Sequence, residues 1–390
     1  MVDVTLVYSL NDYPSKINHH PSTMNTNIVL FDHPYPPQNG GFIDLYYKIE
    51  ALSYFHKNIQ LFCFYKGDKP NSSPLLSFVK DIQFYPRTRK LQFGQPSIVT
   101  FRSDQQLLKD LQNTTGPIVF EGEHTTCFLD HPTLKDRYKI VRSHNVEWQY
   151  YEHLAEAASS FIKNIYYKRE ARLLKKHEAI LYNAQEIWAI SKADEIYFEK
   201  YKTKVRYLPA FHTSEEVTAK IGMGDFALYH GNLSVEENQK AVYFLLNEVI
   251  PHTSIKWVVA GKNPPEQLIL ACKEKGVLLK ANCPEDELNE LLKKAHINVL
   301  PTFQATGIKL KLLNALYKGR HCLVNNQMLE GTSLVNLCTI AQSESEFIKK
   351  IALLQSVSFT EQEKKRREKI LYQDFNNKEN AKKIVQWLNW

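Results

Sequence analysis

The chain has 390 residues, of which 43% are hydrophobic and 23% charged, and its 49 Lys and Arg outnumber 42 Asp and Glu to give a formal net charge of +7. This length predicts two domains of similar size, and the composition is typical of soluble globular proteins. The modest, mixed charge argues against a nucleic-acid binder, and no apolar run reaches the ~20 residues of a membrane-spanning helix.

The first 24 residues stand apart from the rest of the chain. They contain two prolines and a His19-His20 pair, and they lack the basic start and the cleavage site of a signal peptide. Regular patterning begins just after Met24, so we interpret residues 1–24 as an extension that the fold does not need.

Residues 25–210 alternate short β-rich runs with helical patterns. We expect strands over residues 28–31, 59–65, 98–100, 117–121, 138–143, 187–191 and 205–208. We expect helices over residues 42–53, 104–112, 159–182 and 192–201. Strands that alternate with helices predict an α/β domain built on a parallel sheet with right-handed crossovers.

Residues 211–358 repeat this alternation and predict a second domain of the same class. We expect strands over residues 227–230, 256–260, 277–279, 297–300 and 321–324. The expected helices cover residues 238–249, 265–275, 284–295, 309–318 and 344–354. Two such sheets in tandem imply a cleft between them, with ligands at the carboxyl ends of the strands.

Residues 359–390 read as a charged helical tail, with helices over 360–372 and 381–388 around a turn at Asn376-Asn377. The pattern is equally compatible with a tail that caps the second domain and with one that returns to the first.

Six cysteines are scattered without any Cys-x-x-Cys pair: Cys63, Cys127, Cys272, Cys283, Cys322 and Cys338. They lie in or beside apolar segments, so we expect buried free thiols rather than a zinc site or a disulfide framework. Free thiols indicate a reducing, cytoplasmic compartment.

Residues 306–316, Thr-Gly-Ile-Lys-Leu-Lys-Leu-Leu-Asn-Ala-Leu, are the most informative stretch of the chain. A buried strand ends at Pro301, a short loop with Gly307 follows, and a helical pattern begins at Lys309. This geometry aims backbone N–H groups and the positive end of a helix dipole at an anion. Lys309 and Lys311 oppose the dipole and need an anion beside them. We therefore interpret the segment as a phosphate site, for the diphosphate of a nucleotide-sugar.

This segment resembles the C-terminal signature of the retaining, GT-B-fold glycosyltransferases of family 4, the glycosyl transferases group 1. The run Tyr229-His230-Gly231-Asn232-Leu233 is similar to the strand and glycine loop that open the family's nucleotide domain. The run Val258-Val259-Ala260-Gly261-Lys262 is similar to its following strand, and Glu330-Gly331 resembles a Glu-Gly pair late in the same domain.

The first half of the chain carries two further resemblances to this family. Residues 34–41, Pro-Tyr-Pro-Pro-Gln-Asn-Gly-Gly, resemble its first glycine loop, and His144-Asn145-Val146-Glu147 is similar to its His-Asn-x-Glu stretch. The resemblance spans about residues 25–390. It implies two Rossmann-like domains facing a cleft, with 25–210 on the acceptor side and 211–358 binding the nucleotide-sugar.

The resemblance also implies roles for particular residues. Lys309 is the expected catalytic cation at the leaving diphosphate, and the glycine loop is formed by Gly40 and Gly41. The expected donor-binding residues are Gly231, Asn232, Lys262, Thr306, Gly307, Ile308, Lys311 and Asn314. Retention by front-face attack needs no metal and no other cofactor, and no Asp-x-Asp motif occurs in the chain.

On the acceptor side, polar residues follow two predicted strands at their carboxyl ends. His124 and His144 are expected catalytic residues, while Glu121 and Glu123 are expected to contact the acceptor or the transferred sugar. Which of Glu121, Glu123 and His124 makes such a contact stays open, and each is also compatible with a surface-loop role. For His144 the open alternative is a structural histidine.

The chain departs from the family pattern at two positions around the phosphate loop. Thr306 and Asn314 stand where the family usually has glutamates. Asparagine can hydrogen-bond to ribose hydroxyls but makes no charge-assisted contact. An arginine that many members place after the first glycine of the nucleotide domain is also missing.

The resulting hypothesis is a hexosyltransferase that moves a hexose from a nucleotide diphosphate sugar, such as UDP- or GDP-hexose, to a surface polysaccharide or a lipid-linked glycan. The alternative from a different class is a catalytically degenerate partner or scaffold protein, because both glutamates are replaced. A GT-B epimerase would show more carboxylates and histidines in the cleft.

Residues 163–176 predict a basic amphipathic helix with aromatic side chains. A solvated face is the ordinary interpretation of such a helix, and contact with an anionic membrane is the second. We therefore expect a cytoplasmic protein, with peripheral contact at the inner face of the membrane as an open alternative.

Overall fold

The computed structural model describes residues 25–388 except 71–72, 89–91, 159 and 304–309. The strands of the first domain are β1 (Thr26–Leu30), β2 (Ile59–Tyr65), β3 (Asp81–Pro86), β4 (Ile118–Glu121), β5 (Lys139–Ser143), β6 (Glu186–Ala189) and β7 (Lys204–Tyr207). Those of the second are β8 (Ala227–Asn232), β9 (Trp257–Lys262), β10 (Leu278–Ala281), β11 (Ile297–Leu300), β12 (His321–Val324) and β13 (Thr339–Ile340).

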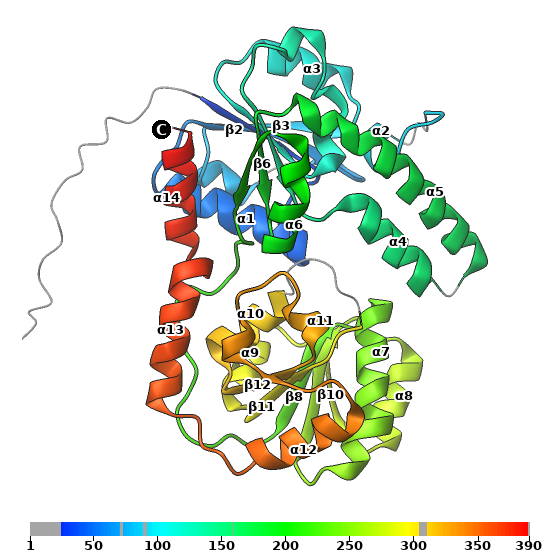
Figure 1. Cartoon of the computed structure of the whole chain (residues 1–390), viewed down its shortest axis with the longest axis vertical. Coiled ribbons are helices and arrows are strands. Elements are labelled where there is room, and N and C mark those ends of the chain that lie inside the picture. The colour runs from blue at the N-terminus through cyan, green and yellow to red at the C-terminus, as the bar shows by residue number, and fades with distance from the viewer. Residues whose placement is uncertain (1–24, 71–72, 89–91, 159, 304–309, 389–390) are drawn as a thin grey trace, which may run out of the picture.

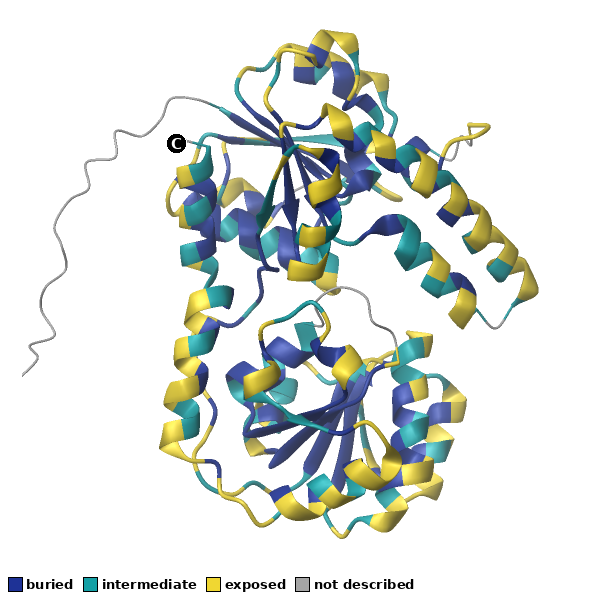
Figure 2. Ribbon diagram, in the orientation of Figure 1, coloured by how far each residue is buried: buried dark blue, intermediate teal, exposed yellow. Residues whose placement is uncertain are grey.

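These strands form two parallel sheets, as the alternating pattern predicts. The first has the order β3-β2-β1-β4-β5-β6-β7 and the second β10-β9-β8-β11-β12-β13. In register, Ile28 of β1 lies opposite Leu61 of β2 on one side and Val119 of β4 on the other. Most strand residues are buried, as is required where helices cover both faces of a parallel sheet (Figure 2).

Helices flank both sheets (Figure 1). The first domain has α1 (Gly40–Ser53), α2 (Ser97–Thr100), α3 (Gln105–Gln112), α4 (Glu147–Ala157), α5 (Phe161–His177) and α6 (Lys192–Phe198). The second domain and the tail have α7 (Glu236–Phe244), α8 (Glu266–Glu274), α9 (Glu285–Lys294), α10 (Leu310–Lys318), α11 (Asn326–Leu329), α12 (Glu344–Leu354), α13 (Glu361–Phe375) and α14 (Asn377–Trp387).

The strand order reverses direction at one point in each sheet, and these points locate the ligand cleft. In the first sheet β1 lies between β2 and β4, and in the second β8 lies between β9 and β11. Loops leave the carboxyl ends of such neighbouring strands in opposite directions and open a crevice for a ligand. Residues that follow β1 and residues at the carboxyl ends of β8 and β9 line one cavity between the domains.

The helical tail crosses from one domain to the other (Figure 1). Leu371 and Phe375 of α13 belong to the core of the second domain. Ala381 and Ile384 of α14 belong to a core of the first, where α14 packs on α1. Asn376 joins the two helices, and its side chain accepts a hydrogen bond from the backbone N–H of Glu379 to cap α14.

The structure corrects two expectations about individual elements, and α4, β3 and β13 are among the elements that the pattern did not predict. Residues 98–100 are not a strand but part of α2, since Phe101 N donates to Ser97 O at 3.0 Å. The helix expected over 159–182 is divided into α5 and a tighter 3-10 helix, Glu178–Asn183. The edge strand β3 was not expected, because its residues are only partly buried and carry a weak pattern.

All six cysteines are free thiols in the structure, as expected. Cys63, Cys272 and Cys322 are buried, and the other three are half-buried.

Candidate functional site

A cavity of about 330 Å³ lies between the two domains. It is lined from the first domain by the loop before α1 and its first turn, and from the second by the ends of β8 and β9 and by α9 and α10. The polar residues that line it are Gln38, Asn39, Thr213, His230, Asn232, Lys262, Glu285, Asn289, Lys311, Asn314 and Lys318.

Glycines let the backbone come close to this cavity from both domains. Gly40 lines it, and a Cβ atom there would lie 3.8 Å from Leu310 Cδ1 of the other domain. Gly41 instead faces Phe31, whose Cζ would lie 3.1 Å from an added Cβ. Across the cleft, a Cβ on Gly261 would lie 2.1 Å from the carbonyl oxygen of Gly231, so β9 tolerates only glycine at that position.

Three described lysines bring positive charge to the cavity. Lys311 Nζ donates to Asn238 Oδ1 at 2.7 Å and lies 5.3 Å from the centroid of the Tyr229 ring. Lys318 Nζ donates to an asparagine of α9 at 2.7 Å, and burial lowers its pKa. Lys262 comes from the carboxyl end of β9. These cations give the cavity a chemistry suited to a phosphorylated ligand.

His230 adds a polar atom without a partner. The side chain is buried at the carboxyl side of β8, and no residue that the structure describes gives its Nε2 a hydrogen-bond partner. Burial, followed by the charges of Lys311 and Lys318, lowers its pKa to about 3, so the ring is neutral at physiological pH. A buried polar atom left unpaired in a cavity lining indicates a place for a ligand group. The sequence pattern placed His230 next to the glycine loop but gave it no role.

The two departures from the family pattern have different outcomes. Thr306, Gly307, Ile308 and Lys309 lie outside the described residues, so their expected roles stay predictions. Asn314 lines the cavity, and its Oδ1 accepts a 3.4 Å hydrogen bond from Thr213 Oγ1. The carboxylate of Glu285 is the acidic group among the described lining residues.

The acceptor-side residues expected from the sequence form a buried network that does not line this cavity. Glu121, at the carboxyl end of β4, is fully buried and paired with Lys48 of α1. Burial alone would raise the pKa of Glu121, but Lys48 and His144 outweigh it and bring the pKa down to about 2. An ionised, fully covered carboxylate of this kind holds its neighbours in place.

His144 is one of two partly exposed members of this network, with a side chain that is 10% exposed. Its Nε2 lies 3.2 Å from Glu121 Oε2, and its Nδ1 lies 3.7 Å from Asp44 Oδ2. Asp44 is held in turn by Arg142, whose Nη2 donates to it at 2.9 Å. Two carboxylates therefore fix the imidazole ring, edge-on to Phe31 at a centroid distance of 5.4 Å.

His124 and Glu123 are the other members of this network: the side chain of His124 is 22% exposed, and Glu123 is buried. Burial lowers the pKa of His124 well below its ordinary value, and its Nδ1 lies 3.9 Å from Glu147 Oε1. Burial, then the nearby Glu147 and Glu178, raises the pKa of Glu123 well above its ordinary value. Among the described residues, neither oxygen of Glu123 has a hydrogen-bond partner. A neutral carboxyl and a neutral imidazole fit this environment.

A smaller cavity of about 240 Å³ also lies between the domains. Asn145, from the His-Asn-x-Glu stretch, lines it from one side, and Glu330 and Gly331 line it from the other. His153 contributes a buried Nδ1 that has no hydrogen-bond partner in the part of the chain that the structure describes. Burial raises the pKa of Asp194 in the same lining to about 6. Two stretches singled out in the sequence thus meet across the domain boundary.

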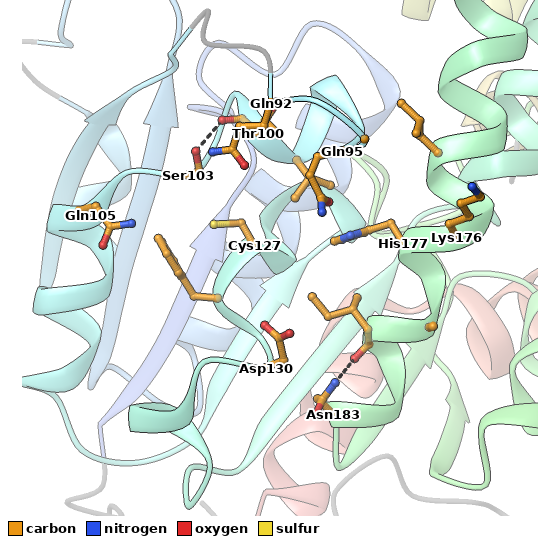
Figure 3. A pocket seen from close by; sticks show the side chains of 16 residues that line it. Gln92, Gln95, Thr100, Ser103, Gln105, Cys127, Asp130, Lys176, His177 and Asn183 are labelled. Carbon is orange, nitrogen blue, oxygen red and sulfur yellow. Dashed lines mark hydrogen bonds between the residues drawn. The ribbon is translucent and has the colours of Figure 1, made fainter.

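A larger cavity of about 580 Å³ belongs to the first domain alone. Figure 3 shows its labelled side chains, among them Cys127, Asp130, Lys176 and His177. His177 Nε2 is 2.9 Å from Thr126 Oγ1, and Asn183 Nδ2 donates to a backbone oxygen at 3.0 Å. No described lining residue leaves a buried side-chain N or O atom unpaired, so this cavity lacks the sign of a ligand seen at His230.

Within the part of the chain that the structure describes, no group of three or more His, Cys, Asp or Glu residues is arranged to hold a metal ion. The absence of a metal from the proposed reaction stays a prediction.

Two Rossmann-like domains facing a cavity define the GT-B class of fold, and solved structures of that class superpose on the chain. WaaG, a glycosyltransferase involved in lipopolysaccharide biosynthesis, aligns with a TM-score of 0.62 at 13% identity, covering 93% of this chain and 99% of that one. Anabaena Alr3699/HepE, solved with UDP and glucose, aligns with a TM-score of 0.62 at 10% identity and the same coverage.

The sequence comparisons point to the same class. Residues 225–356 match the model of the family Glycosyl transferases group 1. A protein of Klebsiella pneumoniae, described as an uncharacterized 44.6 kDa protein in the cps region, is 26% identical over 326 residues, or 79% of this chain and 77% of that protein. The second domain thus supports the resemblance to glycosyl transferases group 1, while family 4 stays a prediction.

Proposed function

We propose that this protein is a retaining hexosyltransferase that uses a nucleotide diphosphate sugar. The observation that carries the proposal is the cavity between the domains, where three lysines and the unpaired Nε2 of His230 surround the carboxyl ends of β8 and β9. The domain that supplies those groups is the one that matches glycosyl transferases group 1. The Anabaena structure of the same fold was solved with UDP and glucose.

The proposed chemistry places positive charge where the leaving group becomes negative. As the bond from the sugar to the diphosphate breaks, charge grows on the phosphate oxygens, and fixed cations and amides aimed at them stabilise the transition state. Lys309 is the proposed principal cation, with Lys311, Lys262 and the backbone at Gly231 as supporting contacts. Front-face attack, with the leaving phosphate taking the proton of the acceptor, would retain configuration without a metal or another cofactor.

The acceptor is proposed to enter from the first domain. Gly40 brings backbone groups to the cavity, and His144 is held with its ring fixed at the carboxyl end of β5. We assign His144 to contact with the sugar or the acceptor and Glu121 to positioning it. A surface polysaccharide or lipid-linked glycan is the proposed acceptor class, which agrees with a relative named for the cps region.

Titration calorimetry tests the donor assignment directly. We expect UDP or GDP, and one of their hexose conjugates, to bind the wild-type protein with micromolar affinity, on the order of 8 kcal/mol. Lys311→Ala should weaken this binding at least tenfold, whereas Lys349→Ala, an exposed position on α12, should leave it unchanged. Equal nucleotide binding by the Lys311 variant and the wild-type protein would contradict the assignment of this cavity as the site of the donor diphosphate.

The catalytic assignment is tested by turnover. Lys309→Ala should lower turnover at least about tenfold with the fold intact, because loss of one charge-stabilising donor typically costs ~2.7–4 kcal/mol of barrier. NMR of the anomeric proton in the first product then separates retention from inversion. Near-normal turnover in the variant contradicts the role of Lys309.

A second candidate is a catalytically degenerate partner protein. It is favoured by the replacement at position 314, where the uncharged side chain of Asn314 lines the cavity in place of a glutamate. This candidate predicts no binding of any nucleotide or nucleotide-sugar in the same calorimetric series. Binding of a nucleotide-sugar without turnover would instead mean that the protein binds the donor but does not catalyse the transfer step.

A further inference from the structure

An unpartnered apolar tip lies on the α4–α5 hairpin, outside both the cavity and the proposed reaction. This hairpin projects from the body of the first domain (Figure 1). In the first turn of α5, Phe161 and Ile162 are 78% and 79% exposed, and Ile165 is 52% exposed. Large apolar side chains gathered at this exposure mark an interaction surface rather than part of the fold.

The rest of the exposed face of α5 is basic. The helix carries six Lys and Arg residues, namely Lys163, Lys168, Arg169, Arg172, Lys175 and Lys176, against the single acid Glu170. Glu170 is buried and accepts hydrogen bonds from the backbone N and the hydroxyl of Ser97, each at 2.7 Å. The outer face of α5, much of which is exposed in Figure 2, therefore combines an apolar end with basic side chains.

The hairpin is anchored by its other face, so the tip is not needed for folding. Ala171 and Leu174 are buried, and the rings of Tyr151 of α4 and Tyr167 of α5 pack at 5.9 Å. Phe161 and Ile162 belong to none of the three hydrophobic cores.

The tip also lies at the mouth of the cleft. Lys163 Nζ is 3.7 Å from Glu236 Oε1, in the first turn of α7 of the other domain. Val235, the residue before Glu236, lines the cavity between the domains. A surface bound to the tip would therefore lie close to the entrance of that cavity.

We propose that this surface of α5 binds the interface of an anionic lipid bilayer. Apolar side chains that enter the headgroup region and cations that bind anionic lipids are the two contributions that stable peripheral binding requires. The basic charge of α5 favours an anionic bilayer over a second copy of the chain as the partner of this surface. An isologous dimer through the tip would bring two basic helices face to face, and like charges in contact oppose association.

Vesicle co-sedimentation of the full-length protein tests the proposal without relying on glycosyl transfer. The wild-type protein should bind vesicles of phosphatidylcholine that contain 30 mol% phosphatidylglycerol. It should bind vesicles of phosphatidylcholine alone at least tenfold more weakly. The double variant Phe161→Gln/Ile162→Gln should bind the anionic vesicles at least tenfold more weakly than wild type. The matched control is Ile269→Gln/Leu270→Gln on α8, where both side chains are also exposed, and it should bind as wild type does.

A charge variant tests the second contribution. Lys168→Gln/Arg172→Gln should weaken binding by roughly fivefold for each residue removed, and added salt should abolish most of the difference. Three results would overturn the proposal: no binding of wild type to anionic vesicles, undiminished binding by the tip variant, or a wild-type dimer that the tip variant converts to a monomer. Nucleotide binding by the tip variant should equal that of wild type, which separates this proposal from the donor assignment.

Discussion

Lys48 and Glu121 form a buried ion pair that supports His144 from within the first domain. Glu121→Gln removes the negative charge and leaves the Lys48 ammonium buried without its partner. Breaking a buried pair in this way typically costs 3–5 kcal/mol of stability. We expect a loss of that order in the free energy of unfolding of the first domain, measured by urea denaturation at pH 7.

The double variant Lys48→Met/Glu121→Gln is the matched control for the same site. It removes both charges, so it should recover most of the stability that the single variant loses. If the double variant is less stable than the single one, packing rather than charge dominates at this position.

Glu147 makes the stability of the protein depend on pH in a known direction. Burial raises its pKa from 4.5 to about 7, so the folded protein favours the neutral carboxyl. Below pH 4.5 the group is neutral in both states; between 4.5 and 7 only the unfolded chain ionises it, and stability falls by about 3 kcal/mol in total. Glu147→Gln should remove this decline and be more stable than wild type at pH 8.

The measurement is the difference between the free energies of unfolding of variant and wild type at pH 5 and at pH 8. Glu152→Gln, an exposed position on the same helix, should show no such change between the two pH values. A difference for Glu147→Gln that stays constant with pH would show that this carboxyl does not titrate as described.

At the scale of elements, sequence patterns located the buried strands best. Strands β2, β11 and β12 have the predicted bounds, because continuous apolar runs flanked by polar residues mark a fully buried parallel strand. For short or weakly patterned segments, the predictions from sequence were wrong or missing. The three-residue run at 98–100 carries no period that separates helix from strand, and β3 is partly exposed at the sheet edge.

Helix α14 shows what the pattern left open about the tail. The packing of α14 on the first domain depends on contacts with α1, more than 320 residues earlier in the chain, which no local pattern encodes. Ile384 is 1% exposed in that contact, so Ile384→Ala should cost about 2–5 kcal/mol in the free energy of unfolding. Hydrogen exchange should accelerate in α1 and not in α12.

Ile384→Val is the conservative control for that contact. Removing one methylene from a buried isoleucine typically costs 0.5–1.5 kcal/mol, so the loss should be several-fold smaller. Equal losses for the two variants would mean that α14 unfolds locally before the core of the first domain does.

At the scale of the whole molecule, the site depends on residues that no single stretch of sequence brings together. The order of motifs predicted a cleft and the glycine loops at Gly40 and Gly231, because such loops follow buried strands in both halves. The sequence did not predict three lining residues of helices α9 and α10, namely Lys318, Glu285 and Asn289. Charged and polar residues of a helix ordinarily face solvent, so their positions in the pattern gave no sign of a site. Lys48 was missed for the same reason, although it is fully covered.

Gly331 tests whether the contact between the domains sets the width of the cleft. It has a φ of +76°, and a Cβ atom there would lie 2.9 Å from Ser191 Cβ of the first domain. Gly331→Ala should therefore add about 1–2 kcal/mol of backbone strain and also push the domains apart, which enlarges the radius of gyration in small-angle X-ray scattering. Gly276→Ala has the same kind of strain, with a φ of +66° and no atom within 4 Å of the added Cβ. The control should thus lose similar stability, while its scattering curve should match that of the wild-type protein. Identical scattering from both variants would show that this contact does not set the width of the cleft.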